Sequence, residues 1–86
     1  MYNIIERYMN KLKKEDIESF ALSKNCHLSE EELNFTYLFV KKNWQEIIKN
    51  PSIFDINRYK DHYSEENFAK INQVYKEYFQ RFSSFL

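Results

Sequence analysis

Glycine is absent from this 86-residue chain, and proline and cysteine each occur once, as Pro51 and Cys26. Without glycine the sequence cannot build glycine-rich phosphate loops or dinucleotide fingerprints, and glycine-dependent hairpin turns are unavailable. A single cysteine excludes an intrachain disulfide, which fits a reducing compartment. These absences favour a helical protein that has no nucleotide-binding loop.

An excess of one charge is also missing, because 13 lysines and arginines balance 13 aspartates and glutamates. Nucleic-acid binders usually carry a basic excess, and a neutral chain does little to keep its copies apart in solution. No apolar run approaches the roughly 20 residues of a membrane span, and the N-terminus lacks a signal-peptide core. We therefore expect a soluble, cytoplasmic protein with no membrane partner, able to associate with itself.

The strongest local signal is a helix start at Ser29. Glu32 follows it at the spacing of a capping box, and Leu28 and Leu33 have the spacing of a hydrophobic staple. Apolar residues then recur at helical spacing for about four turns. The helix should end at Asn50, because a residue that precedes proline avoids the helical region.

Helical spacing also predicts the remaining elements. Two shorter helices should precede Ser29, and Asn25 should end the second of them in the left-handed conformation. An element within residues 51–63 should form a helix of about two turns starting near Asp55, and Ser64 should cap the last helix. That helix carries a stripe made of Phe68, Ile71, Tyr75, Tyr78, Phe79 and Phe82. The sequence predicts an all-α fold, a compact orthogonal bundle of four to five short helices forming one domain over residues 1–86.

The order of these signals also carries a family resemblance. The residues concerned are Ile17, Phe20 and Ala21, Leu28-Ser29-Glu30, Asn50, Ile53-Phe54, Arg58, Phe68, Ile71-Asn72 and Phe79. Over nearly the whole chain this pattern resembles the YqfT-like family, small uncharacterised proteins of low-GC Gram-positive bacteria. Lys13 and Lys14 depart from it, since the family tends to have a threonine cap there. The family has no assigned activity, so the resemblance implies a bacterial cytosolic helical protein and no functional residues.

Catalytic and metal-binding chemistry has few candidates. Cys26 and His27 are adjacent, but a metal site needs three or four converging ligands, and His62, Asp55 and Asp61 are distant in sequence. Glu30, Glu31 and Glu32 fit a helix first turn, where the dipole favours carboxylates. We expect no catalytic residues, no metal, no cofactor and no small-molecule substrate.

A second apolar face on the long helix is the most informative feature. Phe35 and Phe39 lie four residues apart, roughly opposite the stripe of Leu33 and Trp44. Either this helix is central and covered on both sides, or the pair meets a partner. In the second case Phe35, Phe39 and Leu38 form an interface, with a second copy of the chain as the expected partner.

Two functions follow as hypotheses. The first is a non-enzymatic protein–protein interaction module, which can be a homodimer. The alternative is a nucleic-acid-associated helical protein, because lysines and arginines alternate with aromatics, and bases stack on such aromatics. The residues concerned are Lys41, Lys42 and Trp44, then Arg58, Tyr59 and Lys60, then Lys76, Tyr78 and Arg81.

Overall fold

The computed structural model describes residues 2–50 and 54–83, and the side chains of residues 3–50 and 54–77. Its elements are α1 (Tyr2–Lys11), α2 (Lys14–Ser23), α3 (Glu30–Lys49), the 3-10 helix η1 (Ile56–His62) and α4 (Glu65–Ser83). The described ranges contain no strand, so the all-α prediction is confirmed. The side chains predicted to extend the α4 stripe at Tyr78, Phe79 and Phe82 lie outside the described residues, as does Ile53.

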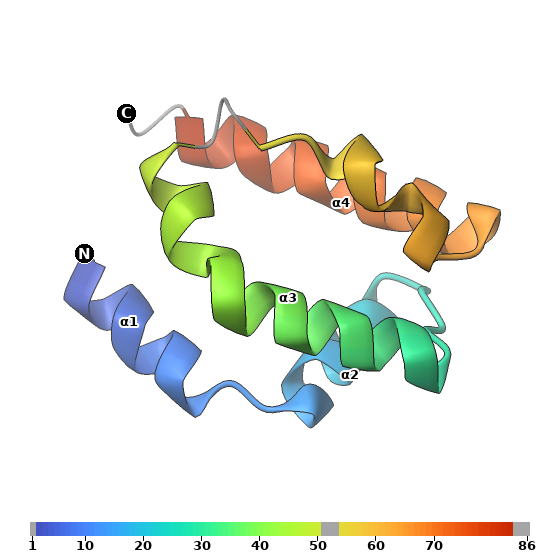
Figure 1. The fold of residues 1–86 in the computed structure, drawn as a ribbon, viewed down its shortest axis with the longest axis horizontal. Coiled ribbons are helices and arrows are strands. Elements are labelled where there is room, and N and C mark those ends of the chain that lie inside the picture. Colours follow the sequence, from blue (N-terminus) through green and yellow to red (C-terminus); the bar gives the residue numbers. More distant parts are fainter. Residues whose placement is uncertain (1, 51–53, 84–86) are drawn as a thin grey trace.

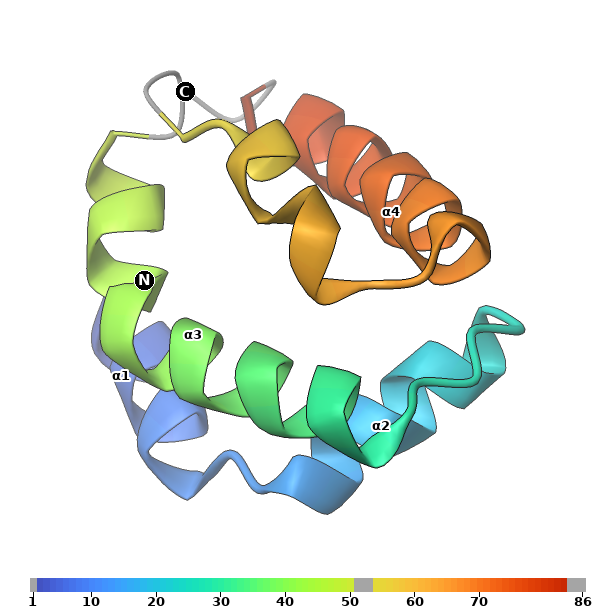
Figure 2. The ribbon, with the colours of Figure 1, turned by 45° about the vertical axis from the view of Figure 1, so that its right-hand side comes forward.

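The helices form two layers on opposite sides of α3. Helix α3 contacts α1 and α2, and α4 contacts η1. Figures 1 and 2 show α1 and α2 below α3, with η1 and α4 above it. The radius of gyration is 12.8 Å, against about 12 Å for a compact chain of this length. The long helix is therefore central to a slightly open bundle.

The helix starts follow the sequence signals. Ser29 Oγ accepts a hydrogen bond from Glu32 N at 3.1 Å, and Glu32 Oε1 accepts one from Ser29 N at 2.7 Å. Both halves of the predicted capping box are confirmed. Ser64 Oγ accepts from Asn67 N at 3.1 Å, which confirms the second cap, and Asn25 has the predicted positive φ of 58°.

The element after the proline is wound more tightly than expected. A helix of about two turns starting near Asp55 was predicted, and the structure has the 3-10 helix η1 from Ile56. Asp55 Oδ1 accepts a hydrogen bond from Asn57 N at 3.0 Å, so this carboxylate fixes the start of the element. Aspartate side chains often bond a backbone amide two residues on in this way.

Lys41 joins α1 to α3. Its Nζ donates to Met9 O at 2.7 Å and to Asn10 O at 3.3 Å. These carbonyls belong to the last turn of α1, where backbone oxygens lack helical partners and cations are favoured. The amine therefore satisfies the end of α1.

The buried apolar core is small. Leu12, Ala21, Cys26 and Trp44 are its buried apolar residues, and Trp44 is 7% exposed. Among the described side chains no large one is completely buried. The described part of the chain also has no helix that is both long and apolar enough to cross a bilayer. Because so few apolar residues are buried, much of the apolar surface of the described helices is only partly buried or is exposed.

Candidate interaction surface

The second apolar face of α3 is covered from within the chain. The Phe35 ring stacks on His62 with centroids 3.8 Å apart and planes 8° apart, and Phe39 lies 4.6 Å from Tyr59. His62 and Tyr59 both belong to η1, and Tyr63 adds an edge-on contact to Phe35. Of the two arrangements expected for this face, the structure has the one in which α3 is central.

Leu38 differs from its two neighbours on α3. Its side chain is 65% exposed, whereas Phe35 and Phe39 are half-buried. The three residues therefore do not share one exposed patch. The interface of Phe35, Leu38 and Phe39 stays a prediction, and Leu38 is the member that a partner can reach most easily.

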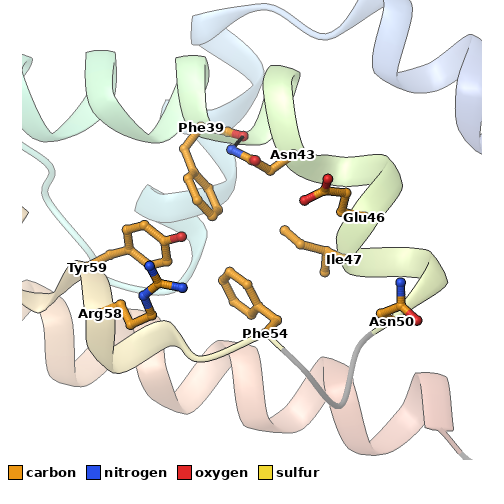
Figure 3. A pocket seen from close by; sticks show the side chains of 8 residues that line it. All are labelled: Phe39, Asn43, Glu46, Ile47, Asn50, Phe54, Arg58 and Tyr59. Atoms are coloured by element: carbon orange, nitrogen blue, oxygen red, sulfur yellow. Dashed lines mark hydrogen bonds between the residues drawn. The ribbon is translucent and has the colours of Figure 1, made fainter.

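A small pocket lies beside this aromatic cluster, between α3 and η1. Figure 3 shows Glu46 pointing into it from α3, with Arg58 beside Tyr59 on the facing wall. Its volume is about 230 Å³, below the roughly 300–1,000 Å³ of most ligand sites. Asn43 Nδ2 already donates to Phe39 O at 3.0 Å. The lining residues are Phe39, Asn43, Glu46, Ile47, Asn50, Phe54, Arg58 and Tyr59.

A buried carboxylate joins the starts of two helices. Glu32 is 6% exposed, and beyond its bond to Ser29 its Oε1 accepts from Asn67 Nδ2 at 2.8 Å. Its Oε2 accepts from Ser64 N at 2.7 Å. The Glu32 side chain thus accepts hydrogen bonds at the N-terminus of α3 and at the N-terminus of α4. Because helix N-termini favour negative charge, both dipoles stabilise it.

The neighbours of Glu32 complete this polar junction. Asn67 is also buried; its Nδ2 donates to His27 O at 2.9 Å, and its Oδ1 accepts from Cys26 Sγ at 3.6 Å. Thr36 Oγ1 lies 2.6 Å from the Tyr63 hydroxyl. No buried side-chain nitrogen or oxygen lacks a partner within the described ranges. The junction is therefore a satisfied structural network.

The Glu32 carboxyl makes the stability of the fold pH-dependent. Burial raises its pKa, but the hydrogen bonds from the Ser29 and Ser64 amides and from Asn67 outweigh burial, and the net pKa is lowered. A lowered pKa contributes stability that is complete above the ordinary carboxyl pKa and is lost as pH falls through the folded value. We expect the melting temperature to fall more steeply in acid for the native protein than for Glu32→Gln, in thermal melts followed by circular dichroism. Parallel curves would contradict this assignment.

The candidate catalytic residues have separate structural partners. Cys26 is 3% exposed, and burial raises the pKa of its thiol, which lowers the fraction of reactive thiolate. His62 stacks on Phe35, and the backbone oxygen of the exposed His27 accepts from Asn67. Among the described residues no group of three or more His, Cys, Asp or Glu is placed to hold a metal ion.

The basic and aromatic residues considered for nucleic acid are divided in the structure. Trp44 is buried, Lys41 is bonded to the end of α1, and Tyr59 packs against Phe39. Arg58 lines the small aromatic pocket (Figure 3). These residues serve packing and capping, and nucleic-acid binding stays a prediction.

A larger cavity lies among α1, α2, α3 and α4. Its volume is about 570 Å³, within the range of ligand and side-chain binding sites. Most of its lining is apolar, and charged side chains come from Asp16, Lys24 and Lys70. The full lining is Tyr8, Met9, Leu12, Asp16, Ile17, Phe20, Ala21, Lys24, Cys26, Leu28, Thr36, Val40, Lys70, Ile71 and Val74.

Exposed apolar side chains lie on α1 and α2, two of the helices that line this cavity. Ile4 is 71% and Tyr8 63% exposed on α1, and Phe20 and Leu22 are exposed on α2. Tyr8 and Phe20 also line the cavity. Ile4 lies one helical turn from Tyr8, whereas Leu22 is on the side of α2 opposite the residues that line the cavity. We call Ile4, Tyr8, Phe20 and the cavity the α1–α2 apolar face.

The sequence pattern identified this face only in part. Helical periodicity places Tyr8 and Phe20 on the apolar faces of the first two helices, and both are exposed in the structure. Ile4 beside Ile5 was the available signal, since consecutive isoleucines widen an apolar stripe beyond one neighbour. Helical periodicity predicts which residues make the apolar side of each helix, but it does not predict which element packs against that side.

The YqfT-like resemblance stays a prediction that rests on the sequence motifs named above. The chain matches no family model, no curated protein and no solved structure.

Proposed function

We propose that this chain is a non-enzymatic protein interaction module that self-associates through the α1–α2 apolar face. The observation that carries the proposal is the amount of surface the chain exposes. A compact protein of 10.7 kDa should expose about 5,500 Å², and this chain exposes 6760 Å². The excess of about 1,200 Å² is spread over the whole chain, and it is comparable in size with the roughly 800 Å² that each partner covers in a standard interface.

The exposed apolar residues locate the interface. Single exposed apolar side chains are ordinary, but a contiguous group marks an interaction site. Ile4 and Tyr8 lie one helical turn apart on α1, so they share one side of the helix. Tyr8 continues into the apolar cavity, and this continuity supports one patch rather than scattered residues.

Charge and symmetry favour a second copy as the partner. The net charge is zero, so no long-range repulsion separates two copies. Most homo-oligomers are twofold dimers that pair the same patch on both subunits. An apolar patch on a neutral chain can pair with the same patch on a second copy without charge repulsion.

The interface is tested by sedimentation velocity over a range of micromolar concentrations. We expect dimers for the native chain, and loss of dimers for Tyr8→Glu because its charge would be buried without a partner. Leu38→Glu is the matched control, since Leu38 is equally exposed and lies on α3. Loss of dimers for Leu38→Glu alone would place the interface on α3, and a native chain that is monomeric throughout would overturn the proposal.

A further inference from the structure

We infer that two copies pair by reciprocal insertion: Ile4 and Tyr8 of each α1 enter the apolar cavity of the other copy. This inference rests on the proposed self-association and names its geometry. The projecting side chains and the cavity lie side by side in one patch, since Tyr8 belongs to both. A twofold axis beside Tyr8 therefore brings each α1 to the partner's cavity, as an isologous interface requires.

The cavity is suited to apolar side chains. Water inside a protein needs two to four polar partners, and a lining supplied by residues such as Leu12, Ile17, Val40 and Ile71 offers few. The cavity opens to solvent, and its volume of about 570 Å³ leaves room for side chains from another segment. An occupant that removes this apolar surface from water is favoured by roughly 25 cal/mol for each Å².

The charged groups at the cavity are already engaged within the chain. Asp16 Oδ2 accepts from Lys13 N at 2.9 Å. The Lys70 amine donates to Asn25 O and lies 3.6 Å from Glu66, and the Lys24 amine lies over the Phe20 ring at 5.9 Å. Because these charges have partners of their own, an entering group needs no charge of its own. This favours the isoleucine and tyrosine of a second copy.

Two variants separate the inserted residues from the cavity that receives them. Ile4→Lys removes the insertion and leaves the cavity lining intact, since Ile4 is not among the lining residues. Val74→Phe narrows the cavity from α4 and leaves α1 intact. Each variant alone should raise the dimer dissociation constant about tenfold or more, as expected for a central interface residue. Leu38→Lys is the control for an added charge.

Mixing the two variants is the decisive experiment. A mixed dimer of Ile4→Lys with Val74→Phe keeps one complete contact, because the intact α1 of one chain meets the intact cavity of the other. Sedimentation velocity should therefore detect dimers at concentrations where each variant alone is monomeric. Circular dichroism melts check that both variants fold. If Val74→Phe does not fold, Ala21→Leu is a second variant that narrows the cavity.

The outcomes separate this inference from the proposed function. A native chain that is monomeric at every concentration overturns both. A native dimer that Ile4→Lys leaves unchanged overturns reciprocal insertion and leaves self-association standing. Two monomeric variants whose mixture also stays monomeric overturn the reciprocal geometry, and recovery of dimers only in the mixture supports it.

Discussion

Replacing Glu32 by alanine is expected to remove a large part of the stability of this fold. The substitution leaves Ser29 N, Ser64 N and Asn67 Nδ2 without their acceptor. Asn67 is buried, and a buried donor left unsatisfied costs about 1–3 kcal/mol. Ser29 and Ser64 are exposed, so their amides can turn to water and each lost cap costs about 0.5–2 kcal/mol; we expect about 3 kcal/mol for the three together. A chain of 86 residues has about 4–13 kcal/mol in total.

Urea denaturation of Glu32→Ala beside Glu31→Ala measures this effect. Glu31 lies in the same helix turn and is exposed, so its loss removes a similar interaction with the helix dipole, worth about 0.3–1 kcal/mol. The midpoint of unfolding should fall far more for Glu32→Ala than for Glu31→Ala. Equal midpoints for the two variants would show that the junction at Glu32 contributes nothing beyond an ordinary first-turn carboxylate.

Replacing Phe35 by alanine is expected to detach η1 from α3. The Phe35 ring contacts Phe39 and three rings from η1 and the residue after it, with His62 nearest at 3.8 Å. Fully buried phenylalanines lose about 3–5 kcal/mol on truncation. Phe35 is half-buried, so we expect about 2–3 kcal/mol.

Leu38→Ala is the control for Phe35→Ala. Leu38 is one helical turn along α3 and 65% exposed, so its truncation should change the free energy of unfolding by less than about 0.5 kcal/mol. Chemical denaturation of both variants below the dimer dissociation constant keeps association out of the comparison. A Phe35→Ala variant as stable as Leu38→Ala would contradict the packing of η1 against α3.

Local signals predicted much of the fold. The capping box of Ser29 and Glu32, the cap at Ser64 and the left-handed Asn25 were all predicted and confirmed. Each depends on residues no more than three positions apart, so the chemistry that fixes it is already present in the local sequence. The all-α class follows from these signals together.

Contacts between distant residues were not predictable in the same way. Glu32 reaches Ser64 and Asn67, which are 32 and 35 residues away, and Lys41 reaches carbonyls about 30 residues earlier. Nothing in the spacing of a glutamate or a lysine specifies such a partner. Helical periodicity likewise shows which side of α1 is apolar, but not that Tyr8 stays exposed.

The position of the candidate interface changed for the same reason. Phe35 and Phe39 formed a second apolar face in the sequence, and the choice between an intrachain cover and a partner was open. The structure supplies the cover from η1. Apart from Leu38 on α3, the exposed large apolar side chains of the described residues lie on α1 and α2.

Sedimentation equilibrium of the native chain at several micromolar concentrations tests self-association most directly. The account predicts a mass that rises with concentration toward twice the 10.7 kDa of one chain. A mass equal to one chain at every concentration would contradict it.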